Sequence, residues 1–198
     1  MTWLKVVGFD PSMRNWGIAS GRLHLHTGEL AMDHLDVIQP VKPEGKQTRT
    51  NSIDLGMAEQ HARGIAQAIL GARAIFVEVP VGSQSAAAMK SYGMCIGLLG
   101  ALRAHGTPFF EVTAIEVKLA GCGKKTASKT EMIQAAQQRY PDLDWPTYRR
   151  KGETLVSESS AEHMADAIFA IQAGLRLPSF QQFRALMAAS TSLQETAV

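Results

Sequence analysis

The chain has 198 residues and is 45% hydrophobic, which excludes a disordered polypeptide and suits a single domain with a sizeable core. No apolar run approaches the length of a transmembrane helix and no signal peptide is evident, so we expect an intracellular protein without a membrane partner. The net charge is +2, but between Thr113 and Lys151 eight Lys or Arg stand against four acids. Such an excess favours either a phosphate backbone as partner or an ordinary solvated face.

The apolar pattern predicts strands and helices along most of the chain. Short β-branched or apolar runs predict strands, and apolar residues three and four apart predict helices. In chain order we predict strands at 3–9, 16–25 and 29–38, a helix from Asn51 or Ser52 to about Leu70, a strand at 74–79, a helix at 84–104, a strand at 108–112, and helices at 116–120, 129–139, 161–175 and 179–187. Ser128 and Glu131 predict a capping box at the start of the 129–139 helix.

The order of these elements indicates an α/β domain. Three consecutive strands suggest a meander, and the strand–helix–strand unit that follows adds parallel strands, which gives a five-stranded mixed sheet flanked by helices. We expect one domain over residues 1–187 and a disordered tail over 188–198. Residues 141–159 are expected to be irregular, and so long a loop in a compact domain is typically functional or mobile.

Three apolar segments carry acidic residues, whose burial is costly unless a positive charge or a hydrogen bond compensates it. Asp10 follows the first strand, and Glu78 lies at the end of the fourth. The helix at 161–175 carries His163 and Asp166, which are three residues apart and therefore share one face. Because ligand sites in α/β sheets lie at the carboxyl ends of the strands, we expect these four side chains to converge.

A convergent set of carboxylates with one imidazole favours a divalent cation. Mg²⁺ prefers oxygen ligands, and Mn²⁺ also accepts imidazole. Two ions bridged by Asp10 would catalyse in-line phosphodiester hydrolysis, one activating water and the other stabilising the leaving oxygen. Taken singly, Asp10 is also compatible with a turn before proline, and His163 with an interior histidine. Three further acids are interpreted as ordinary surface residues, namely Glu162, Glu158 and Asp142.

Four segments match a known pattern in order and spacing over most of residues 4 to 175. Residues 6–19 contain a strand, an Asp-Pro turn and a hairpin glycine, and residues 75–80 form a strand with a second acid. Residues 109–129 contain a strand, a Val-Lys helix, a Gly-x-Gly turn and a lysine, and residues 161–171 form a helix with His and Asp three apart. Together these segments resemble the RuvC family of Holliday-junction resolvases, within the RNase H-like superfamily.

The resemblance implies an RNase H-like fold and a homodimeric, metal-dependent endonuclease that resolves four-way DNA junctions by paired symmetric nicks. The residues that it assigns to catalysis and to two Mg²⁺ or Mn²⁺ ions are Asp10, Glu78, His163 and Asp166, with Lys129 near the scissile phosphate. It also implies dimerisation through the helix at 84–104, and a cytoplasmic location in a bacterial cell or a phage-infected host.

Basic residues outside the acidic cluster are the expected DNA contacts. These are Arg14, Lys118, Lys124, Lys125, Lys129, Arg149, Arg150 and Lys151. Lys118 matches a DNA-facing lysine of the family, and the last three lie in the 141–159 segment, where we expect contact with a DNA arm. Two positions depart from the family pattern. Ser12 replaces a glycine, and Val81 stands where the family often has an aromatic that wedges between bases.

Val81 keeps a second hypothesis open, a less selective RNase H-fold nuclease that acts on flaps, forks, three-way branches or RNA–DNA hybrids. A third class is a non-catalytic protein that binds a DNA structure, a nucleotide or a partner. The four filled ligand positions disfavour a non-catalytic protein. A nucleotide-binding relative would need a glycine-rich phosphate loop, and none follows Asp10.

Overall fold

The computed structural model describes residues 3–42, 49–82 and 85–196, with side chains described as far as Thr191. Its strands are β1 (Trp3–Asp10), β2 (Trp16–His24), β3 (Leu30–Ile38), β4 (Ala74–Glu78), β5 (Phe110–Val112), β6 (Thr147–Arg150) and β7 (Glu153–Val156). Its helices are α1 (Thr50–Ala68), α2 (Ala86–Ala104), α3 (Ala114–Cys122), α4 (Lys129–Arg139), α5 (Glu158–Gly174) and α6 (Pro178–Thr196). The predictions for residues 43–48 and for Gln84 lie outside the described part of the chain.

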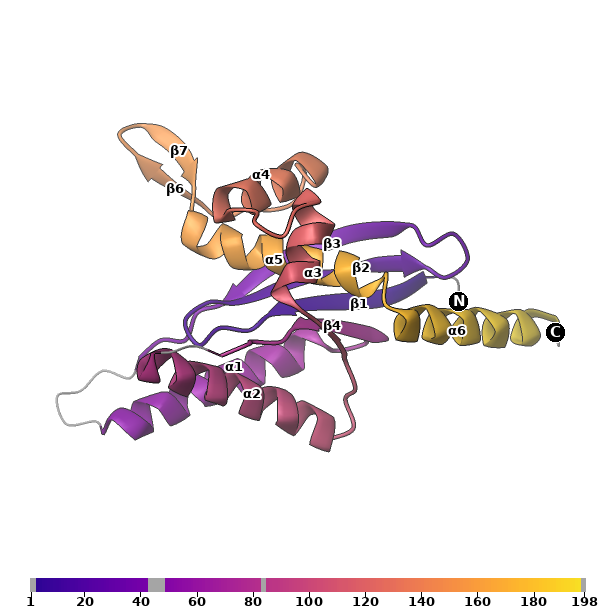
Figure 1. The fold of residues 1–198 in the computed structure, drawn as a ribbon, viewed down its shortest axis with the longest axis horizontal. Coiled ribbons are helices and arrows are strands. Elements are labelled where there is room, and N and C mark those ends of the chain that lie inside the picture. Colours follow the sequence, from indigo (N-terminus) through magenta and orange to yellow (C-terminus); the bar gives the residue numbers. More distant parts are fainter. Residues whose placement is uncertain (1–2, 43–48, 83–84, 197–198) are drawn as a thin grey trace.

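The main sheet has the strand order β3-β2-β1-β4-β5 (Figure 1). Strands β1, β2 and β3 pair antiparallel, whereas β4 pairs parallel with both β1 and β5. The predicted α/β fold with a five-stranded mixed sheet flanked by helices is therefore confirmed. Strand β1 is central, so the residues at its carboxyl end are enclosed by neighbours on both sides.

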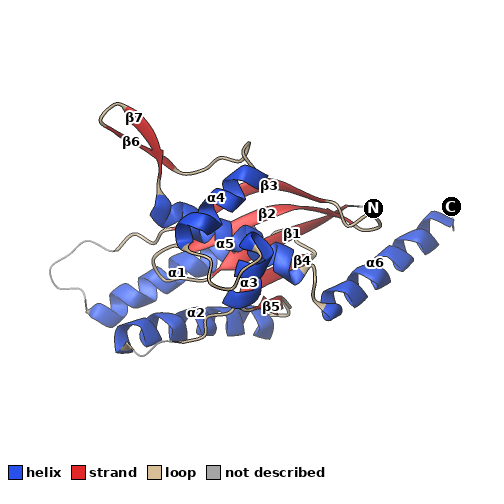
Figure 2. Cartoon of the chain, turned by 45° about the horizontal axis from the view of Figure 1, so that its top comes forward, coloured by secondary structure: helices blue, strands red, loops and turns tan. Residues whose placement is uncertain are grey.

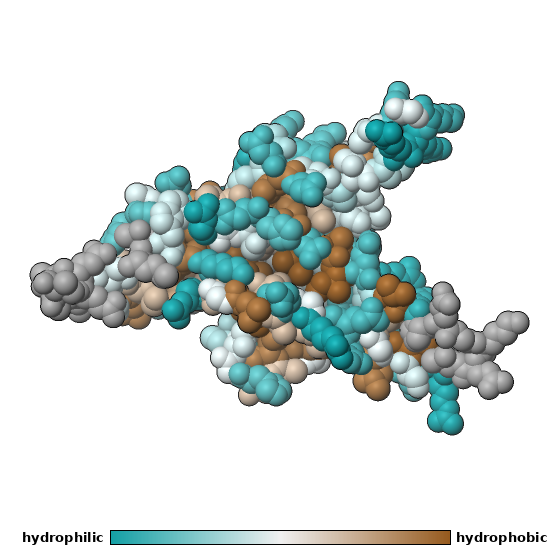
Figure 3. All heavy atoms as spheres, turned by 180° about the vertical axis from the view of Figure 1, so that it is seen from behind, coloured by the Kyte–Doolittle hydropathy of each residue, from teal (hydrophilic) through white to brown (hydrophobic). Residues whose placement is uncertain are grey.

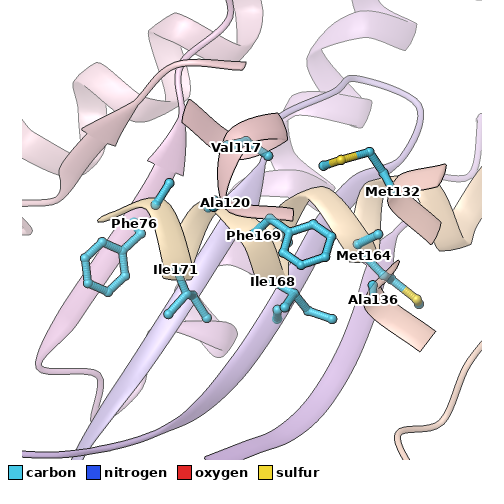
Figure 4. Packing of buried hydrophobic residues seen from close by; sticks show 14 of the residues in the cluster. Phe76, Val117, Ala120, Met132, Ala136, Met164, Ile168, Phe169 and Ile171 are labelled. Carbon is cyan, nitrogen blue, oxygen red and sulfur yellow. The ribbon is translucent and has the colours of Figure 1, made fainter. Parts of the chain in front are cut away.

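Helices cover both faces of the sheet (Figure 2). One core layer joins α1 and α2 to strand residues such as Val7 and Val77, and the other joins α3, α4 and α5 to residues such as Val6 and Phe76. On the second face, Phe169 of α5 lies among side chains of α3 and α4 (Figure 4). Alternation along a strand sends successive side chains to opposite faces, which explains why adjacent residues belong to different layers.

Helix α5 lies unusually close to the sheet, and two glycines make this possible. A Cβ on Gly8 would lie 2.1 Å from the carbonyl oxygen of Ala167, and one on Gly17 would lie 2.1 Å from that of His163. Any side chain at either position would push α5 away from β1 and β2. The close approach brings the first turns of α5 against the end of β1, where Asp10 stands.

Local signals account for some helix boundaries but not for others. The capping box of Ser128 and Glu131 is present, and α4 has the predicted bounds. In contrast, the prediction that Asn51 or Ser52 caps the first long helix is wrong. That helix begins at Thr50 and is preceded by Arg49, whose side chain makes no capping hydrogen bond. Its buried face, at Met57, His61 and Ile65, matches the predicted apolar spacing, so packing rather than a cap defines α1.

The prediction that residues 141–159 are irregular is wrong. They contain the β6–β7 hairpin, which projects from the body of the domain (Figure 1). Arg150 pairs with Glu153 across a two-residue turn in which Lys151 has φ 51° and Gly152 has φ 86°. Positive φ at both central residues defines the type I′ turn that two-residue hairpins favour. A lysine at the first position is a weak turn signal, which is why the sequence pattern missed it.

Helix α6 continues to Thr196 instead of ending near residue 187, so the residues of the predicted tail are helical as far as that point. At its start Phe180 is buried and packs edge-on against Phe76 and Phe110. The rest of α6 extends away from the sheet (Figure 2). The division of the chain at residue 187 stays a prediction. Within the described ranges no helix has the length and apolar character needed to cross a membrane.

Candidate active site

Strand alternation places both strand-end acids on the face that α5 covers. In β1, Val6 belongs to the α5 layer and Val7 to the opposite layer, so Asp10 shares the α5 side with Val6. In β4, Phe76 belongs to the α5 layer, and Glu78 two residues later lies on the same side. The parallel register pairs Phe9 with Val77, so Asp10 and Glu78 are the next residues along neighbouring strands.

Helix α5 brings the third group of ligands to this edge. Its first turns carry Glu162, His163 and Asp166, and these three side chains line one pocket of about 330 Å³ together with Asp10 and Glu78. All four residues that the sequence predicted as metal ligands thus meet in one place. Their separations along the chain are large, and the close packing of α5 on Gly8 and Gly17 is what joins them.

A short hydrogen bond links the helix to the central strand. His163 Nδ1 lies 2.5 Å from Asp10 Oδ2, and the two side chains are 20% and 15% exposed. Burial favours the neutral imidazole, but the hydrogen bond and charge of Asp10, with the charges of Glu162 and Asp166, outweigh it and raise the pKa of His163. Because a carboxylate only accepts, Nδ1 donates, and in the neutral ring Nε2 keeps its lone pair for another partner.

The carboxyl groups of Glu78 and Asp166 resist ionisation in the protein alone. Burial, followed by the negative charges of Asp10 and Glu162, raises the pKa of Glu78 to about 8, although Lys118 opposes the rise. Burial also raises the pKa of Asp166 well above its ordinary value, with further contributions from Asp10 and Glu78. Carboxyl groups crowded in a dry pocket repel one another when charged, and a cation relieves that repulsion.

The chemistry of this donor set fits a divalent cation. Carboxylate oxygens with one imidazole nitrogen suit Mg²⁺ or Mn²⁺, and a bound cation would offset the burial and mutual repulsion that raise the pKa of Glu78 and of Asp166. In the part of the chain that is described, however, no three His, Cys, Asp or Glu side chains are arranged so as to hold one ion. The hydrogen bond between His163 and Asp10 already occupies Nδ1 of the imidazole and Oδ2 of the carboxylate, two atoms that could otherwise bind an ion.

Glu162 is part of this pocket, and its interpretation as an ordinary surface acid was wrong. The side chain is 19% exposed and forms an ion pair of 2.8 Å with Lys129, which is 76% exposed. This contact, more than any other, raises the pKa of Lys129. The signal was available in the sequence, because Glu162 and Asp166 are four residues apart and therefore share a helix face.

None of the other predicted DNA contacts lines this pocket. Lys118 on α3 is close enough to lower the pKa of Glu78 by its charge. Lys124 forms an ion pair with Glu131. Arg14 and Lys125 are exposed in the loops after β1 and α3. Arg149, Arg150 and Lys151 are exposed on the β6–β7 hairpin.

Two polar residues of the pocket, besides Glu162, have no counterpart among the predicted site residues. Ser12 follows the Asp-Pro turn, and Tyr92 reaches the pocket from α2. Tyr92 precedes Gly93 in the predicted 84–104 helix, where an aromatic residue is ordinarily a packing residue, so the sequence pattern did not mark it as part of a site. Val81, where the family often has an aromatic, also lines the pocket and is 86% exposed.

Comparison with known proteins supports the fold independently of this site. No model of a protein family matches the chain, and no curated protein is significantly similar to it. Among solved structures, RuvC from Thermus thermophilus in complex with Holliday-junction substrate is similar, with a TM-score of 0.56 and 17% identity over 86% of this chain and 96% of that one. A second T. thermophilus RuvC structure gives a TM-score of 0.55 at 17% identity, covering 86% of this chain and 97% of that one. The chain therefore has the RuvC-like fold of the RNase H-like α/β class.

Proposed function

We propose that this protein is a metal-dependent endonuclease that resolves four-way DNA junctions by paired symmetric nicks. The observation that carries the proposal is the convergence of Asp10, Glu78, His163 and Asp166 in one pocket at the carboxyl edge of the sheet. The fold is that of a protein whose structure was determined with Holliday-junction substrate, and the predicted ligand positions are all filled.

The four convergent side chains would hold two Mg²⁺ or Mn²⁺ ions. Bound divalent ions supply an activated water and stabilise the leaving oxygen in phosphodiester hydrolysis. His163 holds the Asp10 carboxylate in a fixed orientation through its Nδ1 hydrogen bond. Glu78 and Asp166 must lose their protons before they act as ligands, so their raised pKa values couple ion binding to proton release.

Lys129 is the proposed phosphate contact of the active site. Its ammonium group lies at the rim of the pocket, paired with Glu162. A phosphodiester that enters the pocket competes with Glu162 for this ammonium group, so Lys129 turns from the carboxylate to the substrate. Glu162 then serves to hold Lys129 near the reacting phosphate before the substrate arrives.

Paired nicks require two active sites, and we propose that α2 forms the dimer interface. The exposed Ile96 lies on the same side of α2 as Gly93, Gly97 and Gly100, and a Cβ added to any of these glycines would meet nothing within 4 Å. The opposite side of the helix packs into the core through Cys95 and Leu99. Two such glycine-bearing faces can approach closely around a two-fold axis that matches the symmetry of the junction.

The direct test is Asp10→Asn, assayed on a synthetic four-way junction in Mg²⁺. We expect cleavage to fall at least about a hundredfold, because a carboxylate that would hold the ions is lost, while junction binding is retained. Glu59→Gln serves as control, since it removes one charge from an exposed position on α1 outside the pocket. Cleavage by the Asp10→Asn protein at the wild-type rate would refute the assignment.

The second candidate function is a less selective nuclease on the same fold. The observation that favours it is Val81, which offers no aromatic ring at the position where the family often has a base wedge. Four-way, three-way, flap, fork and RNA–DNA hybrid substrates compared in Mg²⁺ separate the two functions. Equal cleavage rates on all five substrates would support the less selective enzyme, and a strong preference for the four-way junction the resolvase.

A further inference from the structure

A second cavity lies beside the candidate active site, between α4, the β6–β7 hairpin and the start of α5. It measures about 540 Å³ and its walls include Gln134, Gln137, Tyr148 and Leu155. None of these residues takes part in the proposed hydrolysis. We call this cavity the hairpin groove, because residues of the β6–β7 hairpin line it. The hairpin itself projects from the domain (Figure 1).

One wall of the hairpin groove is a platform for a flat ring. Tyr148 and Leu155 are directly opposite in the β6–β7 register, so their side chains share one face of the hairpin. They are 45% and 37% exposed, although both are large and apolar. An aromatic ring beside an aliphatic side chain is the surface on which nucleobases stack, whatever their sequence.

The facing wall offers groups that hydrogen-bond to the edge of a base. Gln134 and Gln137 are three residues apart on α4 and therefore point the same way. Within the described ranges neither amide makes a hydrogen bond to another residue. An amide group both donates and accepts, so this wall complements the mixed polarity of a nucleobase edge.

The hairpin groove and the candidate active site are formed by neighbouring residues of α4 and α5. Thr130 in its wall is adjacent to Lys129, the proposed phosphate contact, and Ser159 in its wall is one helical turn before Glu162. A DNA strand bound at Lys129 therefore passes close to Thr130 and to the groove that Thr130 lines. This proximity makes the substrate strand itself the natural occupant.

Charge favours a base rather than a phosphate inside the hairpin groove. The acid in its wall is Glu158, which repels phosphate. The positive charges lie at the exposed tip of the hairpin, on Arg149, Arg150 and Lys151, where hydrophilic atoms gather (Figure 3). A strand can therefore keep its backbone along the basic tip while a base turns inward onto Tyr148.

We propose that the hairpin groove binds an unpaired nucleotide of the DNA substrate, stacked on Tyr148, on the strand that passes through the active site. The inference rests on the proposed nuclease function for its choice of substrate. It assigns to the β6–β7 hairpin the stacking contact that Val81 does not supply. The base that enters is one left unpaired at the branch point, since turning an unpaired base outward costs less free energy than extruding a paired one.

The test uses four-way junctions that carry 2-aminopurine at successive positions near the branch point, with metal chelated so that no cleavage occurs. We expect the wild-type protein to quench the fluorescence at one position, because the base stacks on Tyr148. Tyr148→Phe should preserve the quenching, whereas Tyr148→Ala should abolish it and weaken binding about tenfold. Thr154→Ala is the matched control, because Thr154 is exposed on the opposite face of the same hairpin.

The outcomes separate this inference from the proposed function. Quenching and affinity that are unchanged in Tyr148→Ala would overturn the groove assignment, even if the enzyme cleaves junctions normally. Quenching that depends on Tyr148 in a protein that cuts no DNA would support the groove and reject the nuclease. Equal losses in Thr154→Ala and Tyr148→Ala would also overturn the groove, since they would trace the effect to the hairpin fold.

Discussion

Glu78 makes the protein's stability depend on pH. Its pKa is raised from 4.5 to about 8 by burial and by Asp10, so in the folded state it keeps a proton that the unfolded chain loses. Between these two values the folded state binds more protons, and the free energy of unfolding therefore falls as pH rises. A tenfold difference in proton affinity between the folded and unfolded states is worth about 1.4 kcal/mol, so the total loss reaches a few kcal/mol.

We therefore predict that, without metal, urea unfolding shifts to lower midpoints as pH is raised from about 4.5 to about 8. Glu78→Gln should reduce this slope, and Asp166 accounts for the part that remains. Saturating Mg²⁺ should flatten it, because the ion binds the deprotonated carboxylates. A slope equal in wild type and Glu78→Gln would contradict the burial of this carboxyl group.

The acids of the site differ in how far the sequence alone predicts them. Asp10 and Glu78 end apolar strands, so strand polarity and the β-sheet edge were enough to bring them together. Glu162 was missed because an acid beside a histidine at the start of a helix is usually exposed. Its four-residue spacing from Asp166 indicates the shared helix face, but its pairing with Lys129 of α4 is a contact between elements that no local pattern encodes.

At the scale of elements, the hairpin shows what sequence patterns leave out. The main sheet was predicted because long apolar runs repeat with clear periods. Strands β6 and β7 are four residues each and exposed along most of their length, so they bury too little to leave a pattern. The same exposure makes the hairpin available to a partner.

The basic tip of this hairpin should contribute to DNA affinity through phosphate contacts. Replacing Arg149, Arg150 and Lys151 together by Ala removes three exposed charges. We expect junction binding to weaken. The negative slope of log affinity against log salt concentration should become shallower by about 2 to 3, because fewer counterions are released. Fluorescence anisotropy across a salt series measures the slope. An unaltered slope in the triple variant would show that the tip does not touch DNA.

At the scale of the whole molecule, one face of α2 is buried in the core and the other is exposed. Cys95 and Leu99 pack the inner face against the sheet, and this packing explains why that side of the helix is apolar. The outer face keeps Ile96 43% exposed beside glycines that leave room for a close neighbour. In the proposed dimer a second copy of the chain would cover this face and would also supply the second active site that paired nicking needs.

Ile96→Glu should convert a dimer into a monomer, because a carboxylate buried at a tight helix interface costs several kcal/mol. Sedimentation at micromolar concentration measures the mass, and circular dichroism checks that the fold is retained. The monomer should nick one strand of a junction without the coordinated second cut. Leu186→Glu, which adds the same charge to an exposed apolar position on α6, is the control. An Ile96→Glu protein that stays dimeric and still makes paired cuts would show that the dimer interface does not involve α2.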